Sequence, residues 1–243
     1  MKIITNTRLI NRNKKIGQIL TFTAIAVLVL GLIISLTGSV QNITYSYIAL
    51  IIGFLISQFG IYYSNKFGRS PRPDEQVSAS LKGLDDRYSL YHYATSASHL
   101  LVGPSGVWTI LPYNQPGIIT FEKGKYRQKG GNWYLKLFAQ EGLGRPEKEA
   151  QYALEDIQKF FLRQMDADSV PTVHPLLLFT NPKVTVKASD APYVTVDADK
   201  VKDFLRKKAK DNAFPLEKVN QINAVILPED KSLEETKDES ANN

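Results

Sequence analysis

The sequence predicts an α/β protein with an N-terminal transmembrane helical hairpin followed by a mixed-sheet domain flanked by helices. Two observations predict the hairpin. No charged side chain occurs between residues 16 and 65, and this stretch contains two apolar runs, 16–36 and 43–63. A third observation predicts the domain: after residue 73, apolar segments of strand length alternate with amphipathic segments of helix length.

Each apolar run is long enough to cross a bilayer as a helix. At about 1.5 Å per residue, each would span roughly 31 Å, close to the roughly 30 Å of a hydrocarbon core. A cleaved signal peptide is the alternative for the first run, but a second run follows after the short polar stretch 37–42. We therefore expect a hairpin at residues 16–65 that contacts the lipid bilayer.

Basic residues flank the hairpin, whereas its loop has none. The flanking cations are Arg8, Arg12, Lys14 and Lys15 before the first run, and Lys66, Arg69 and Arg72 after the second. Because basic residues stay preferentially on the cytoplasmic side, we expect a multi-pass protein of the cell membrane with both termini cytoplasmic. Residues 1–15 would form a basic cytoplasmic N-terminus and residues 66–73 a linker. The absence of cysteine agrees with a reducing cytosol.

The net charge of +6 arises from the residues around the hairpin rather than from the domain. Residues 1–72 hold eight basic and no acidic side chains, and residues 228–243 hold two basic and six acidic ones. Residues 73–227 are left with a charge of +2, which offers little support for a nucleic-acid binder. The polar, acidic tail at 228–243 is predicted to be disordered.

The domain at residues 74–227 begins with a predicted helix over 74–84, for which Asp74 is the expected N-cap. Strands and a hairpin follow, separated by breaks that contain glycine and proline. The predicted strands are 88–93, 99–102, 107–111 and 118–121, and the predicted hairpin joins 125–127 to 133–137.

A long amphipathic helix is predicted over 146–164, because its apolar residues share one face and Pro146 suits a first turn. Asp197 or Asp199 is the expected cap of a later helix. The remaining predicted elements are a buried strand at 173–180, a short strand at 193–196, a helix at 198–210 and a final strand at 221–227. This order predicts a mixed sheet.

The segment from Ser98 to Ile110, SHLLVGPSGVWTI, resembles the central hairpin of the NERD (nuclease-related) domain. Asn114 and Gly117 are similar to a turn of that family, and Phe-Thr-Asn-Pro at 179–182 resembles the segment after its central strand. Residues 194–204 are similar to its closing strand and helix, so the resemblance covers about residues 74–208. It implies a restriction-endonuclease-like core of the PD-(D/E)xK type and metal-dependent cleavage of phosphodiesters.

The resemblance places three of the family's catalytic positions at Ser98, Leu111 and Tyr113, where the family has two acidic residues and a lysine. Glu75 on the first helix is the acidic position that is retained. Because Mg²⁺ takes clustered oxygen ligands, we expect no catalytic residues, no metal site and no cofactor here.

A basic and aromatic segment follows the fourth predicted strand. Its candidate binding residues are Lys123, Lys125, Arg127, Trp133 and Tyr134. Interleaved cations and aromatic rings can hold phosphates and stack bases, and they can equally rest on an anionic leaflet. The simplest alternative is a solvated hairpin with an aromatic inner face. His99 is expected to be structural, because a metal site needs converging ligands.

These features predict a membrane-anchored, non-catalytic NERD-like domain that binds or scaffolds an unknown protein partner. Gly31, Gly53 and Gly60 could allow close helix approach in a homo-oligomer. The alternative is a membrane-tethered nuclease or nucleic-acid-binding module that uses Mg or Mn at a displaced site around Glu122. Gly124 stands against it, because it occupies the position where Glu-x-Lys spacing requires a lysine.

Overall fold

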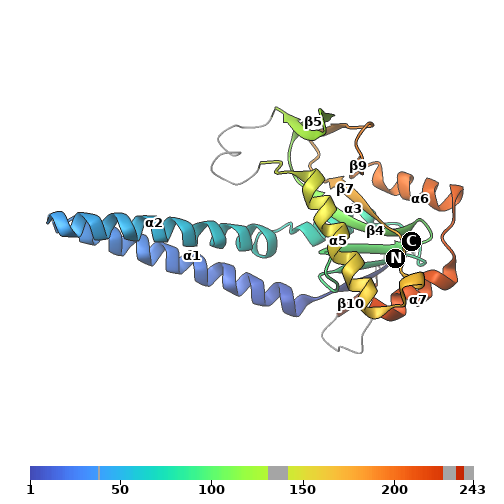
Figure 1. Ribbon diagram of the computed structural model, residues 1–243, viewed down its shortest axis with the longest axis horizontal. Coiled ribbons are helices and arrows are strands. Elements are labelled where there is room, and N and C mark those ends of the chain that lie inside the picture. Colours follow the sequence, from blue (N-terminus) through green and yellow to red (C-terminus); the bar gives the residue numbers. More distant parts are fainter. Residues whose placement is uncertain (38, 131–141, 227–233, 238–243) are drawn as a thin grey trace. The chain divides into compact units, whose positions relative to one another are not determined.

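A computed structural model describes residues 1–37, 39–130, 142–226 and 234–237 of the chain (Figure 1). The chain forms two compact units. One is the hairpin Thr7–Pro73, and the other is a domain that combines Met1–Asn6 with Asp74–Asn243. The first six residues thus belong to the α/β domain, although the whole hairpin separates them from it in sequence.

The hairpin consists of α1 (Thr7–Ser35) and α2 (Val40–Tyr63), and α2 continues into a short π-helix, η1 (Ser64–Gly68). Both long helices have the length and composition to cross a membrane. Buried positions recur every seven residues on each helix: Ile10, Gly17, Ala24 and Gly31 on the first, and Ser46, Gly53, Gly60 and Phe67 on the second. This period is typical of two helices that coil around each other with a left-handed twist.

Small residues in this seam let the two helix backbones approach closely. A Cβ atom at Gly31 would lie 2.9 Å from the Cβ of Ala49, and one at Gly53 would lie 2.7 Å from the Leu28 side chain. The Ser46 hydroxyl also donates a 2.8 Å hydrogen bond to the Gly31 carbonyl oxygen. The close approach therefore occurs between the two helices of one hairpin, and the homo-oligomer stays a prediction.

Seven strands form the main sheet of the domain, in the order β10-β1-β2-β3-β4-β7-β9. Their bounds are β1 Lys2–Thr5, β2 Ser89–His92, β3 His99–Gly103, β4 Gly106–Tyr113, β7 Val173–Phe179, β9 Val194–Asp197 and β10 Glu234–Lys237. Three neighbouring pairs are parallel, namely β1 with β2, β4 with β7, and β7 with β9. The others are antiparallel. The predicted mixed sheet is confirmed.

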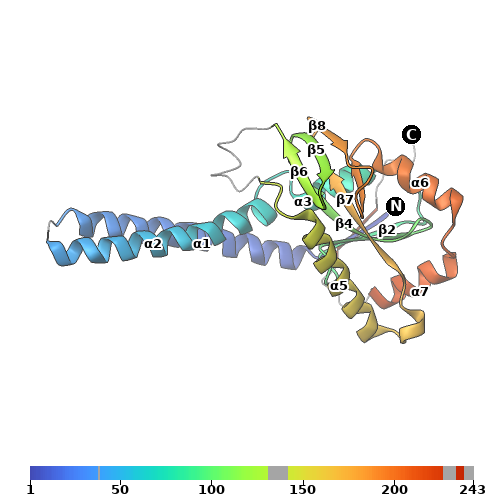
Figure 2. The same ribbon diagram turned by 45° about the horizontal axis from the view of Figure 1, so that its top comes forward.

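Helices cover both faces of this sheet (Figure 2). On one face, α3 (Pro73–Leu81) and α6 (Val201–Asp211) contribute buried residues to a first core cluster. On the other face, α5 (Pro146–Gln164) and α7 (Leu216–Ile226) contribute to a second. A single turn of 3₁₀ helix, Ala167–Ser169, lies between α5 and β7.

A second, smaller sheet has the order β6-β5-β8 and consists of β5 (Gly117–Glu122), β6 (Lys125–Lys129) and β8 (Val184–Lys187). Lys123 and Gly124 connect β5 to β6 with φ angles of 53° and 73°. Two positive φ values are typical of a type I′ hairpin turn. Residues 125–127 therefore pair with β5, while their predicted partner 133–137 lies outside the described residues.

Most predicted elements occur within a few residues of their expected bounds, but the final strand at 221–227 is wrong. Residues 221–226 belong to α7, whose buried side chains are Val219, Ile222 and Ile226, and residue 227 lies outside the described residues. Their spacing of three and four is helical, and it places all three on the face that packs against the sheet. The expected cap is also shifted, because Lys200 is the N-cap of α6 and donates its backbone N–H to Asp197 Oδ1 at 3.1 Å.

Two strands occur where the sequence indicated none. Lys2–Thr5 lies in the range assigned to a basic N-terminus, and Glu234–Lys237 lies in the range predicted to be disordered. β1 pairs with β2 on one side and with β10 on the other. Ile4 is 1% exposed and belongs to the second core cluster. The rest of the predicted tail lies outside the described residues.

Truncating Ile4 should destabilise the domain although it precedes the hairpin. We expect Ile4→Ala to lower the free energy of unfolding by about 2–5 kcal/mol and Ile4→Val by about 1 kcal/mol, because both remove buried methyl groups. Urea unfolding of the full chain in detergent would measure both. If the Ile4→Ala midpoint equalled that of the wild type, β1 would contribute nothing to the domain.

Candidate functional site

The segments that carry the family resemblance meet where β4 and β7 end. The Thr180 backbone N–H donates to the Tyr113 carbonyl oxygen at 2.8 Å. The Asn181 side chain donates to the Asn114 carbonyl oxygen at 3.1 Å. The Gly117 N–H donates to the Lys183 carbonyl oxygen at 2.9 Å. Two segments that are far apart in sequence thus form one corner at the carboxyl ends of parallel strands, where α/β sheets commonly bind ligands.

Two positions that the resemblance aligns with the family's carboxylates are Leu111, on β4, and Ser98, immediately before the neighbouring strand β3. In the β3–β4 ladder, Leu100 pairs with Thr109. Continuing this register by two residues places Ser98 opposite Leu111. Leu111 packs against the third core cluster, which includes Tyr113 and Phe179. The corner therefore has a hydroxyl and an aliphatic chain at positions where a metal site would need carboxylates.

Tyr113, which the resemblance aligns with the family's lysine, is 6% exposed. Its ring stacks on Phe179 with centroids 5.3 Å apart, and its hydroxyl donates a 2.7 Å hydrogen bond to Glu149 Oε2 on α5. Burial, followed by the charge of Glu149, raises the pKa of Tyr113 far above its usual range. The phenol is therefore neutral and cannot replace a lysine cation.

Glu75 lies half-buried on α3, beside Gln76. The Thr180 hydroxyl donates to Gln76 Oε1 at 2.6 Å, which joins α3 to the corner. Within residues 1–37, 39–130, 142–226 and 234–237, no group of three or more His, Asp or Glu side chains is placed to hold a metal ion. Among these described residues, Glu75 therefore does not belong to a cluster of side chains that could hold a metal ion.

His92 and His99 form a buried pair that the sequence analysis missed. Both are 1% exposed, and their Nδ1 atoms lie 2.8 Å apart. His92 Nε2 lies 2.8 Å from the Ser78 hydroxyl on α3. In a hydrogen bond between the two Nδ1 atoms, one atom carries the proton and the other accepts it. Both Nδ1 atoms therefore cannot be protonated at the same time. The two histidines are opposite each other in the β2–β3 ladder, which a correct strand register would have indicated.

The predicted binding residues lie mainly on β6. Lys125 and Arg127 are exposed, and Lys123 lies in the turn. Tyr126 points inward, where its hydroxyl is 2.8 Å from that of Thr195. Trp133 and Tyr134 lie outside the described residues. This part of β6 has the aromatic inner face and solvated outer face that the simplest alternative predicted.

Glu122, the centre of the alternative displaced site, lies at the end of β5 and pairs with Lys129 at 2.9 Å. This hydrogen-bonded cation lowers the pKa of Glu122. Both side chains are largely exposed, and a single exposed carboxylate in an ion pair is a weak metal ligand.

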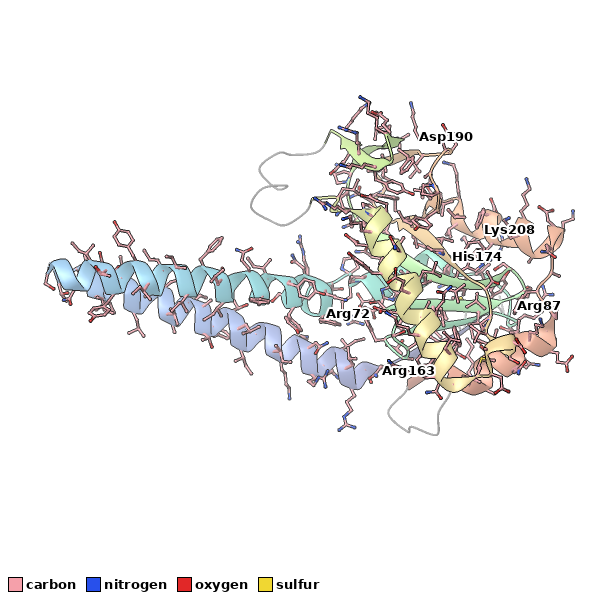
Figure 3. All side chains as sticks on the ribbon, in the orientation of Figure 1. Arg72, Arg87, Arg163, His174, Asp190 and Lys208 are labelled. Atoms are coloured by element: carbon pink, nitrogen blue, oxygen red, sulfur yellow. The ribbon has the colours of Figure 1, made fainter. Side chains whose placement is uncertain are left out.

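A cavity of about 410 Å³ lies at the opposite ends of β4 and β7. Its lining includes Ser105, His174, Asn212 and Lys218. His174 on β7 and Lys208 on α6 are both labelled in Figure 3. Partial burial, followed by the charge of Lys208, lowers the pKa of His174. The cavity has a size typical of ligand pockets, and its lining segments are separated in sequence, so sequence reasoning could not assemble it.

No family model, curated protein or solved structure matches this chain.

The buried Tyr113 phenol should make the domain sensitive to alkali. Its raised pKa means that folding stability is fully present below about pH 10, the ordinary tyrosine pKa, and is lost above it. The expected loss from this group is about 1.4 kcal/mol per pH unit. Tyr113→Phe should flatten this decline in urea unfolding measured from about pH 9 to 12. Tyr152→Phe, which alters a ring that is 59% exposed, should leave the decline unchanged, and equal effects of the two variants would contradict the assignment.

Proposed function

We propose that this chain is a membrane-anchored, non-catalytic NERD-like domain that binds or scaffolds a partner. The observation that carries the proposal is that Leu111 on β4 and Ser98, immediately before β3, occupy the positions that the resemblance aligns with the family's carboxylates. Neither side chain can supply the carboxylate oxygens that would hold Mg²⁺ against a phosphodiester.

The order of elements supports a restriction-endonuclease-like core for this proposal. Helix α3 is followed by three antiparallel strands, β2 to β4, and then by helix α5 and the parallel strand β7. The hydrogen bonds between the segments that resemble the NERD family add further support, because they join at one corner the pieces that the resemblance identified separately.

The position of the hairpin within the chain supports the proposed orientation. The chain enters α1 from β1 and returns from η1 to α3, and β1 and α3 belong to the same domain. If α1 and α2 span a bilayer, both outer ends of the hairpin must then lie on one side of it. The flanking cations favour the cytoplasmic side. The large apolar side chains of the spans are mostly exposed, as contact with lipid requires.

The alternative is a tethered nuclease or nucleic-acid-binding module with a displaced metal site. Its catalytic form has less support, because Glu122 is exposed and paired with Lys129. The nucleic-acid-binding form of this alternative rests on the cations of β6.

The non-catalytic assignment can be tested by rebuilding the site. The full chain in detergent with millimolar Mn²⁺ should cleave neither DNA nor RNA. The variant Ser98→Asp/Leu111→Glu should gain Mn²⁺ affinity of at least about tenfold, because two carboxylates would face each other across the ladder. Electron paramagnetic resonance of free Mn²⁺ would measure it.

The matched control adds the same two carboxylates at exposed positions, as Ser96→Asp/Leu216→Glu, and should gain no affinity. Cleavage by the wild type that is lost in Glu75→Ala or Glu122→Ala would overturn the assignment in favour of a nuclease. If the two double variants bound Mn²⁺ equally, the placement of the family positions would be wrong.

The orientation can be tested with single cysteines, because the chain contains none. In right-side-out membrane vesicles, a membrane-impermeant maleimide should label Thr37→Cys in the loop and leave Glu217→Cys on α7 unlabelled. Inverted vesicles should give the reverse pattern, and detergent should expose both. Labelling of Glu217→Cys from outside would contradict cytoplasmic placement of the domain.

A further inference from the structure

The small sheet presents one strongly basic face, which we call the basic face. It comprises the outward side chains of β6, β5 and β8 together with the turn between β6 and β5. Its cations are Lys123, Lys125, Arg127, Lys129 and Lys187. In the ladders, Thr120 pairs with Arg127 on one side and with Lys187 on the other. Because neighbouring strands are about 4.8 Å apart, these two cations flank Thr120 across a width of about 10 Å.

This face concentrates the positive charge of the domain. Its five cations and one carboxylate, Glu122, give a net charge of +4. Residues 73–227 together carry only +2, so the remainder of that range is at −2. Within the described parts of the chain, Glu122 pairs with Lys129, and the other four cations form no ion pair. Like charges gathered without counter-charges repel one another, and an anionic surface would relieve this repulsion.

The shape and composition of the basic face indicate which kind of anion it fits. Tyr126 and its ladder partner Phe121 both pack into the third core cluster, so within residues 117–129 and 184–187 no aromatic ring faces outward. Proteins that bind single-stranded nucleic acid stack bases on such rings. On the basic face, Ile118 is 39% exposed and lies opposite Lys129, with Arg127 and Lys187 at the diagonal positions of the two ladders. Cations around an aliphatic side chain suit a headgroup layer, in which phosphates lie above hydrocarbon.

We propose that the basic face binds the anionic phospholipid headgroups of the membrane that holds the hairpin. This inference rests on the proposed membrane anchor. Only Asn6 lies between β1 and α1, and residues 69–72 lie between η1 and α3. Because the chain tethers the domain to the hairpin, binding to the same bilayer is intramolecular and a modest affinity suffices. The cytoplasmic leaflet is anionic, and each Lys or Arg near it contributes to attraction.

A single fluorophore can report this docking in the full chain. Thr185→Cys on β8 lies on the basic face and would carry an environment-sensitive dye. After reconstitution into nanodiscs, the dye should become shielded from aqueous quenchers when phosphatidylglycerol is included with phosphatidylcholine. It should be exposed in phosphatidylcholine alone and should be released by high salt. Residence of the protein in the discs, measured separately, tests the anchor.

Removing cations from the basic face should release the domain. Each substitution should lower the ratio of docked to free domain about fivefold, which corresponds to about 1 kcal/mol per cation. Lys125→Gln/Arg127→Gln/Lys187→Gln should therefore lower it about 100-fold. The matched control, Lys207→Gln/Lys208→Gln/Lys210→Gln on α6, removes the same charge from another exposed surface and should leave the ratio within about twofold of the wild type.

Three results would overturn the inference while leaving the anchor intact. The first is equal shielding in discs with and without phosphatidylglycerol. The second is an equal effect of the two triple variants. The third is shielding of the dye by duplex DNA or single-stranded RNA at lower concentrations than by anionic lipid, which would assign the face to nucleic acid. Failure of the protein to enter the discs would instead contradict the proposed function.

Discussion

Parallel pairing of β1 with β2 attaches both ends of the hairpin to one folded domain. The Lys2 N–H donates to the Tyr88 carbonyl oxygen at 2.9 Å, and the Asn6 N–H donates to the His92 carbonyl oxygen at 3.0 Å. Without β1, the backbone groups at this edge of β2 and the core site of Ile4 would be open to water. The domain therefore cannot be understood as a module that begins after the hairpin.

The framework of the corner at the ends of β4 and β7 is separate from the chemistry of its side chains. Backbone hydrogen bonds from Thr180 and Gly117 hold the corner together, and these bonds do not depend on which side chains face it. The side chains that do face it form internal contacts, with Tyr113 bonded to Glu149 and Thr180 bonded to Gln76. These contacts stabilise the fold and satisfy the buried polar groups, a role that bonds to a metal ion would otherwise fill.

Positive charge is concentrated in two separate places in this chain. Under the proposed anchor, the cations around the hairpin would direct membrane insertion, and their effect would depend on which side of the bilayer they occupy. The cations of the basic face are instead gathered by strand pairing, which brings Lys187 beside Arg127 across β5. A count of charges over the whole chain combines the two and hides the second, because the rest of the domain is slightly acidic.

The sequence by itself determined the two spans, the helix Pro146–Gln164 and most strand positions, because hydrophobic periodicity is a local property. It also contained the seven-residue spacing of Gly17, Ala24 and Gly31 that packs the hairpin. The sequence also contained the helical spacing of Val219, Ile222 and Ile226, which the predicted strand overlooked. Only the tertiary structure decided that Lys2–Thr5 is a strand and that His92 meets His99. The reason is that a four-residue segment has too few side chains to show a period, so its state depends on a partner that is distant in sequence.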